Sequence, residues 1–164
     1  MSESAGSKNL PVNHSGRLFI YIQRIILTFW IGGVWATGYL VVPAIFGNLP
    51  EPAQAGKLAG QLFTLFSWVG LVCAALLSIA YYFLDRAKWR FILLAIMALL
   101  IMINLFYLTP HILEMREQAA AMLNSDMARQ KQFAMLHGIA SGLYLLTSLL
   151  GLLLVLRQPD IETA

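Results

Sequence analysis

Long apolar segments separated by short polar connections dominate this chain. They occupy residues 25–46, 62–84, 91–108 and 143–156, and the last has a flank that reaches back to Phe133. No central position of these segments is charged. Because a hydrocarbon layer of about 30 Å needs roughly 20 apolar residues in a helix, the pattern predicts an all-α integral membrane protein, an antiparallel four-helix bundle.

The polar connections complete the predicted layout. Spans are expected at about 20–46, 57–84, 90–110 and 133–156, within a transmembrane domain of residues 17–157. Residues 1–16 are polar and predict a disordered cytoplasmic tail, and residues 158–164 form a C-terminal tail. Between 111 and 132, apolar residues recur at helical spacing, which predicts that helices three and four extend beyond the membrane as a hairpin.

Two prolines, Pro43 and Pro110, lie inside or at the end of spans. Each lacks the amide that would bond the carbonyl four residues earlier, so both helices are expected to bend near the outer face. Such bends either shape a pocket or simply end a helix.

Composition agrees with a single membrane domain. Hydrophobic residues make up 59% of the 164 positions and charged residues 12%, against roughly 25% charged in soluble domains. Ala53-Gln54-Ala55 has the small residues of a signal-peptide cleavage site, but the preceding apolar segment is too long for a signal peptide, so we expect no cleavage. Cys73 is the single cysteine, which excludes an intrachain disulfide and predicts a packing role.

The net charge of +3 is distributed at helix ends. The end with both termini has seven Lys and Arg residues and the opposite end has four. By the positive-inside rule, this difference predicts that both termini are cytoplasmic. The expected compartment is the inner membrane of a bacterium. No basic stripe suited to nucleic acid is present. The expected partners are the lipid bilayer, and other membrane proteins or a second copy.

Small residues predict how the helices pack, because backbones approach closely where side chains are small. Helix three has few such residues and is expected to face lipid more than the others. The amide of Asn104 predicts an interhelical hydrogen bond, with substrate contact as the alternative. The other predicted packing residues are Gly33, Thr37, Gly56, Gly60, Gly70, Ala74, Ser78, Gly138, Gly142 and Gly151.

Candidate chemistry is sparse. The absence of charge at membrane depth argues against a proton-coupled pump, and no catalytic residues are evident. His111 and His137 lie at the outer ends of helices three and four, and Glu114 follows His111 by three residues. These groups could hold Zn²⁺, and the two imidazoles could ligate haem b. The favoured interpretation is that they are interfacial histidines bonded to water, headgroups or backbone, so no cofactor is expected.

The pattern as a whole resembles the transmembrane protein 205-like family, a domain of unknown function. The resemblance covers roughly residues 20–156 and implies a four-helix integral membrane protein without known catalytic residues. Haem-binding membrane proteins of the protoporphyrinogen oxidase type share only the architecture, because they pair a histidine with an embedded lysine that this chain lacks. The resembling positions are 29–33, 42–46, 60–63, Asn104, Pro110, Phe133, Leu136, His137, Gly138 and Ser141.

Three functions are compatible with these features. The favoured one is a non-enzymatic structural or accessory component that acts through helix packing and the outer hairpin. The second is a haem- or metal-binding redox protein that uses His111 and His137. The third is a carrier of small apolar or weakly polar solutes, which requires a cavity lined by Thr37, Asn104 and Ser141.

Overall fold

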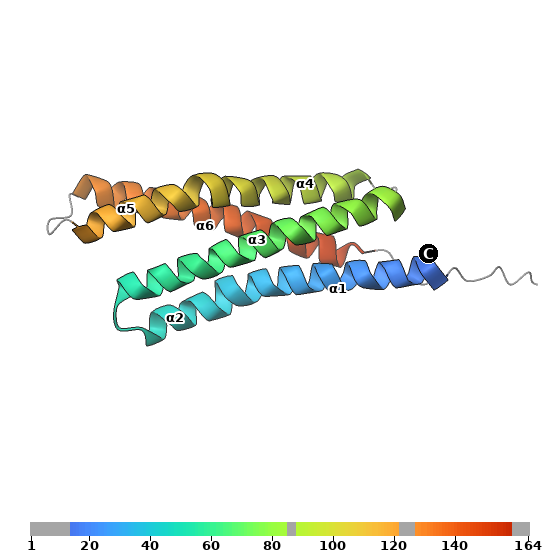
Figure 1. Cartoon of the computed structure of the whole chain (residues 1–164), viewed down its shortest axis with the longest axis horizontal. Helices are drawn as coiled ribbons and strands as arrows, with labels where there is room; N and C mark the ends of the chain where they lie inside the picture. Colours follow the sequence, from blue (N-terminus) through green and yellow to red (C-terminus); the bar gives the residue numbers. More distant parts are fainter. Residues whose placement is uncertain (1–13, 85–87, 122–126, 159–164) are drawn as a thin grey trace, which may run out of the picture.

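The computed structural model describes residues 14–84, 88–121 and 127–158, and every regular element in them is helical. They form four long rods, of which the first and third each contain a π-helical segment (Figure 1). The first rod is α1 (His14–Ala36), η1 (Thr37–Val41) and α2 (Val42–Asn48). The second is α3 (Pro52–Leu84), the third is α4 (Lys88–Met102), η2 (Ile103–Leu108) and α5 (Thr109–Ala121), and the fourth is α6 (Met127–Leu156).

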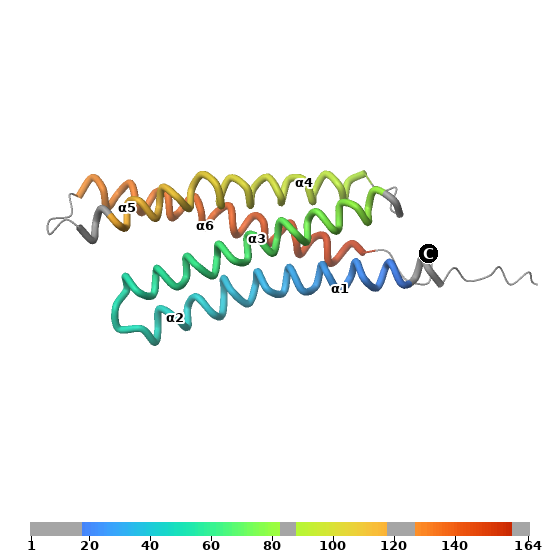
Figure 2. The backbone as a smooth tube through the Cα atoms, viewed as in Figure 1, coloured from blue at the N-terminus to red at the C-terminus, as the bar shows by residue number. Residues whose placement is uncertain are grey.

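The rods form an up-down-up-down bundle in which each has two neighbours. α1 packs against α3 and α6, and α4 packs against the same two helices. The chain runs continuously through each π segment, and both described chain ends lie at the same end of the bundle (Figure 2). The prediction that helix three faces lipid more than the others is wrong, since α4 buries Leu94, Met97 and Ile101.

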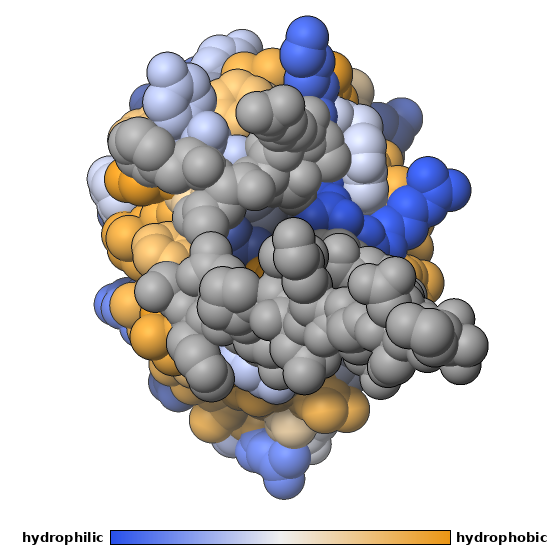
Figure 3. All heavy atoms as spheres, turned by 90° about the vertical axis from the view of Figure 1, so that its right-hand side faces the viewer, coloured by the Kyte–Doolittle hydropathy of each residue, from blue (hydrophilic) through white to orange (hydrophobic). Residues whose placement is uncertain are grey.

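The four rods have the length and hydropathy of membrane spans. Within the described part of the chain these are Leu18–Asn48, Pro52–Tyr82, Lys88–Glu117 and Met127–Leu156. Their outer surfaces are strongly apolar, with Ile25 and Leu40 exposed by 67% and 70%. In an end-on view, apolar side chains make up much of the visible flank, with hydrophilic side chains among them (Figure 3). The sequence prediction of an all-α membrane bundle is therefore confirmed, and the chain is an integral membrane protein.

The helices are longer than the sequence indicated. α1 begins at His14, so residues 14–16 are helical and not part of a disordered tail. The rest of the expected N-terminal tail and residues 159–164 of the expected C-terminal tail lie outside the described residues. α3 begins at Pro52 instead of 57. Arg116 of α5 contacts Gly56 near the start of α3, so the first turns of α3 lie beside the segment expected to form the outer hairpin.

Each helix-interior proline follows a π-helical segment. η1 ends two residues before Pro43, and η2 ends two residues before Pro110. The wider turns are closed by bonds over five residues, from the Val42 amide to the Thr37 carbonyl and from the Thr109 amide to the Asn104 carbonyl. The π turn thus lets the helix continue where proline cannot donate the usual bond.

A continuous apolar core fills the half of the bundle nearer the chain ends. Its largest fully buried side chains are Trp30, Leu27, Leu77, Leu94 and Met97. Cys73 belongs to this core, as its apolar sequence context suggested. Beyond Trp30 the packing becomes more polar, and the two π segments lie in this second half.

Candidate functional site

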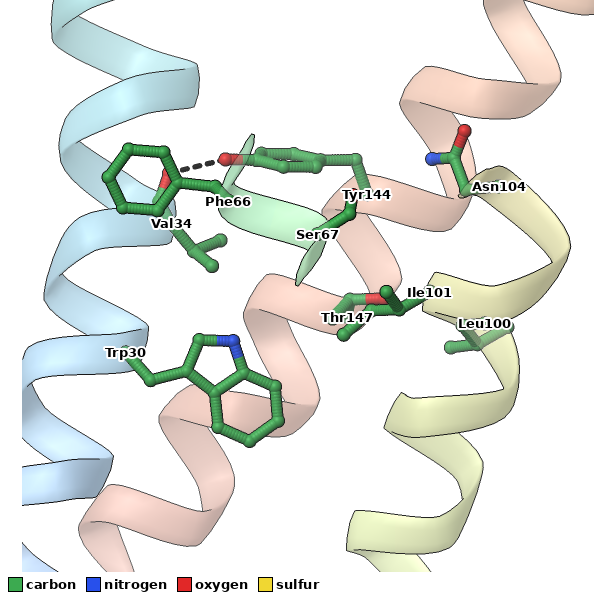
Figure 4. Close-up of a pocket in the computed structure, with 9 residues that line it drawn as sticks. All are labelled: Trp30, Val34, Phe66, Ser67, Leu100, Ile101, Asn104, Tyr144 and Thr147. Atoms are coloured by element: carbon green, nitrogen blue, oxygen red, sulfur yellow. Dashed lines mark hydrogen bonds between the residues drawn. The ribbon is translucent and has the colours of Figure 1, made fainter. Parts of the chain in front are cut away.

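Side chains from all four rods line a small, partly open cavity near the middle of the bundle (Figure 4). Its volume is about 20 Å³, measured as the space open to the centre of a water molecule. Since a water needs roughly 10–15 Å³ by this measure, the cavity has room for about one. It is lined by Trp30, Val34, Phe66, Ser67, Leu100, Ile101, Asn104, Tyr144 and Thr147.

Among the residues around this cavity, Trp30 has a buried hydrogen-bond donor without a partner in the described chain. Its side chain is completely buried, and its indole Nε1 has no hydrogen-bond partner. The ring lies against α3, where a Cβ added at Gly70 would be 2.8 Å from Nε1. Glycine at position 70 therefore makes room for the indole that borders the cavity.

A row of side-chain hydrogen bonds joins α1 and η1 to α6 beside the cavity. The Tyr144 hydroxyl donates to the Val34 carbonyl, as the dashed line in Figure 4 shows. The Tyr39 and Ser148 hydroxyls lie 3.0 Å apart, and Trp35 Nε1 donates to the Ser148 carbonyl at 3.5 Å. Because lipid cannot replace these partners, the bonds align the two helices in depth.

We expect Tyr144→Phe to lower the free energy of unfolding by about 1 kcal/mol, because it removes one interhelical hydrogen bond and leaves the ring in place. The measurement is a thermal or denaturant unfolding curve in mild detergent. Tyr107→Phe is the matched control, since the Tyr107 side chain is 61% exposed. Equal stability of the two variants would contradict the assigned role of the Tyr144 hydroxyl.

Asn104 lies in η2 and connects the third rod to the fourth. Its Nδ2 donates to the Ala140 carbonyl at 3.2 Å, an interhelical bond of the kind the sequence predicted. Its own carbonyl closes the π turn and also accepts from Thr109 Oγ1 at 2.9 Å. Asn104 also lines the cavity. The other two residues predicted to line a solute cavity do not: Thr37 is buried elsewhere and Ser141 is exposed.

Several predicted packing glycines accept large side chains instead of a neighbouring backbone. A Cβ added at Gly33 would lie 2.5 Å from the Phe66 ring, and one at Gly151 would overlap Ile31. Gly38, which the sequence analysis did not single out, has the same relation to the Tyr144 ring. Ala74 is buried and Ser78 is half-buried on α3.

Two glycine pairs from the small-residue pattern do not meet another helix backbone within the described chain. A Cβ added at Gly138 or at Gly142 would meet no atom within 4 Å, so this pair does not pack against the rest of the described chain. Gly56 and Gly60 face the guanidinium of Arg116, not another helix backbone. Spacing alone could not distinguish these cases, because it does not show which side of a helix faces inward.

Arg116 is a site residue that the sequence identified only as one of the four Lys and Arg residues at the end opposite the termini. Its Nη1 donates to the Gly56 carbonyl on α3, and its guanidinium carbon lies 5.5 Å from the centre of the Phe133 ring on α6. It thereby joins three helices at the end of the bundle away from the core. The signal in the sequence was its position beside Met115, on the apolar stripe of the predicted hairpin.

His111 and His137 lie on the outer surface. His111 Nδ1 is 2.6 Å from the Tyr107 carbonyl one turn earlier, and the His137 ring stacks on Phe133 with centres 6.0 Å apart. In the part of the chain that the structure describes, no group of three or more His, Cys, Asp and Glu side chains could hold a metal ion. The predicted combination of His111, Glu114 and His137 is therefore not brought together.

Comparison with known families adds one result. The model of a family described as "Domain of unknown function (DUF4149)" matches residues 25–121, which is more than half of the chain. The chain belongs to the DUF4149 family. No curated protein and no solved structure matches it significantly.

The matched DUF4149 region runs from α1 to the end of α5. It includes both π segments, the cavity residues Trp30 and Asn104, and the Gly56–Arg116 contact. α6, which contributes Tyr144 and Thr147 to the cavity, lies outside the matched residues. The family assignment supports an integral membrane protein of unknown function and specifies no reaction.

Proposed function

We propose that this DUF4149 protein is a non-enzymatic accessory component of the membrane, and that it binds another transmembrane helix through the outward side of α6. This glycine face consists of Gly138, Ser141, Gly142 and Leu145, which recur at helical spacing and are all exposed. The observation that carries the proposal is that Gly138 and Gly142 have no neighbour within 4 Å of an added Cβ. Small residues on a lipid-facing helix surface allow a second backbone to approach closely.

The interior of the bundle supports a binding role over transport. The cavity is about 20 Å³, enough for one water molecule but not for a solute. The exposed histidines bond to or stack on their own helices, which favours the interfacial interpretation over metal or haem binding.

We further infer that both termini are cytoplasmic, in the inner membrane of a bacterium, and that the protein is of the transmembrane protein 205-like type. The charge pattern supports this orientation, because Arg24 and Arg90 line a polar pocket at the end where the described chain ends lie. The family type is supported by residues 29–33, 42–46, 60–63, Asn104 and Pro110, which all fall within the DUF4149 match.

Gly142→Leu tests the proposed interface. We expect this variant to fold normally and to lose its bound transmembrane partner, because a leucine side chain separates the two backbones. The measurement is crosslinking in native membranes followed by purification in mild detergent, which reports both a second copy and a different membrane protein.

Gly32→Leu is the matched control, since Gly32 on α1 also has no neighbour within 4 Å of an added Cβ. Retention of every crosslinked species in Gly142→Leu, or the same loss in Gly32→Leu, would exclude the glycine face as the interface.

A further inference from the structure

The buried indole of Trp30 has no hydrogen-bond partner within the described part of the protein. A molecule bound beside it could supply one. Nε1 is a donor with no protein acceptor, in a side chain with 0% exposure. Leaving such a donor unsatisfied destabilises the folded state, and native proteins satisfy nearly all buried donors with protein or ordered water. The indole borders the central cavity, and Figure 4 shows its nitrogen on the side of the ring nearer Thr147.

The other polar groups around the cavity define what the occupant must offer. The Thr147 hydroxyl already donates to the Leu143 carbonyl at 2.8 Å, and the Tyr144 hydroxyl donates to the Val34 carbonyl. Their hydrogens are therefore used, and what they retain is acceptor capacity on oxygen. One of the two hydrogens on Asn104 Nδ2 is used by the Ala140 carbonyl, so the second hydrogen and Oδ1 remain available.

The occupant has to accept one hydrogen bond from the indole, and a molecule that also donates to a hydroxyl oxygen uses the remaining acceptor capacity of the site. An apolar molecule can do neither, and a molecule with acceptors alone can do only the first. Water does both and fits the volume of about 20 Å³, since an internal water typically makes about three hydrogen bonds.

We propose that the cavity is a binding site for one water molecule, which accepts from Trp30 Nε1 and donates to Thr147 Oγ1, with Ser67 as a further partner. The site lies between the four rods, in the more polar half of the bundle next to η2. The water extends the polar contacts of this half of the bundle, and it stabilises the position of Trp30 against Gly70.

The proposal can be tested by NMR of protein labelled with ¹⁵N-tryptophan in detergent micelles. Trp35→Phe, Trp68→Phe and Trp89→Phe assign three of the four indole signals, so the fourth is Trp30 without a Trp30 variant. We expect the Trp30 indole N–H to show a nuclear Overhauser cross-peak to water and a downfield shift typical of a hydrogen-bonded indole. Absence of the cross-peak together with an upfield shift would overturn the proposal.

Thr147→Val and Thr64→Val form a matched pair that separates the bound water from a general change in packing. Both threonines donate to the carbonyl four residues earlier, but only Thr147 lines the cavity. We expect loss of the Trp30 cross-peak in Thr147→Val and its retention in Thr64→Val. A high-resolution structure should also show density within hydrogen-bond distance of Trp30 Nε1; an empty cavity there, or equal effects of the two variants, would refute the site.

Discussion

Gly70→Leu is expected to lower the free energy of unfolding by about 2–3 kcal/mol, and the melting temperature in detergent by roughly 5–10 °C. Even a Cβ at position 70 would lie 2.8 Å from Trp30 Nε1 and 3.1 Å from Ile101 Cδ1. A leucine adds three more carbons at a site where Trp30 is completely buried and cannot move without displacing the core. The measurement is the thermal unfolding midpoint in mild detergent.

Gly142→Leu is the control for this prediction, because it introduces the same side chain where an added Cβ meets nothing within 4 Å. We expect its stability as a monomer to differ from the unsubstituted protein by less than about 0.5 kcal/mol. Equal destabilisation by the two substitutions would show that the helices do not have the rotations described here.

Arg116→Ala is expected to destabilise the outer end of the bundle by about 2–4 kcal/mol, from the loss of a charged hydrogen bond and a cation–π contact. The guanidinium links Gly56 on α3 to Phe133 on α6, and the continuous apolar core lies in the other half of the molecule. Hydrogen–deuterium exchange should therefore increase first in the early turns of α3 and α6. The stability of Arg116→Lys should lie between that of the unsubstituted protein and that of Arg116→Ala, since an ammonium keeps the charge but loses the planar stacking surface.

Lys131→Ala removes the same charge from an exposed position on α6. It should leave both the stability and the exchange pattern nearly unchanged. If Arg116→Ala behaved like Lys131→Ala, the contact with Gly56 would carry no stability.

The spans and their antiparallel order could be predicted because insertion depends on the length and hydropathy of each segment, which are local properties. The role of Asn104 was accessible for the same reason, since an isolated amide in an apolar helix needs a partner. The prolines indicated where the helices depart from α geometry. They did not indicate that a π turn would accommodate the missing backbone hydrogen bond, so that each helix continues past its proline.

The packing could not be predicted from spacing, because the same small residue can admit a backbone, a ring or a partner outside the chain. Gly33 admits the Phe66 ring, Gly56 admits the Arg116 guanidinium, and Gly142 admits nothing within its own chain. The assignment depends on how each helix is rotated about its axis. That rotation is set by all of its neighbours together.

The amino-acid sequence by itself determined that four apolar helices cross a membrane, because a run of apolar residues of that length has no other favourable environment. Only the tertiary structure decided that Trp30, Asn104, Tyr144 and Thr147 border one cavity, and that the glycine face of α6 is left open. The physical reason is that burial in lipid acts on each helix separately. Steric fit and hydrogen bonding inside the bundle act between residues as far apart as Val34 and Tyr144.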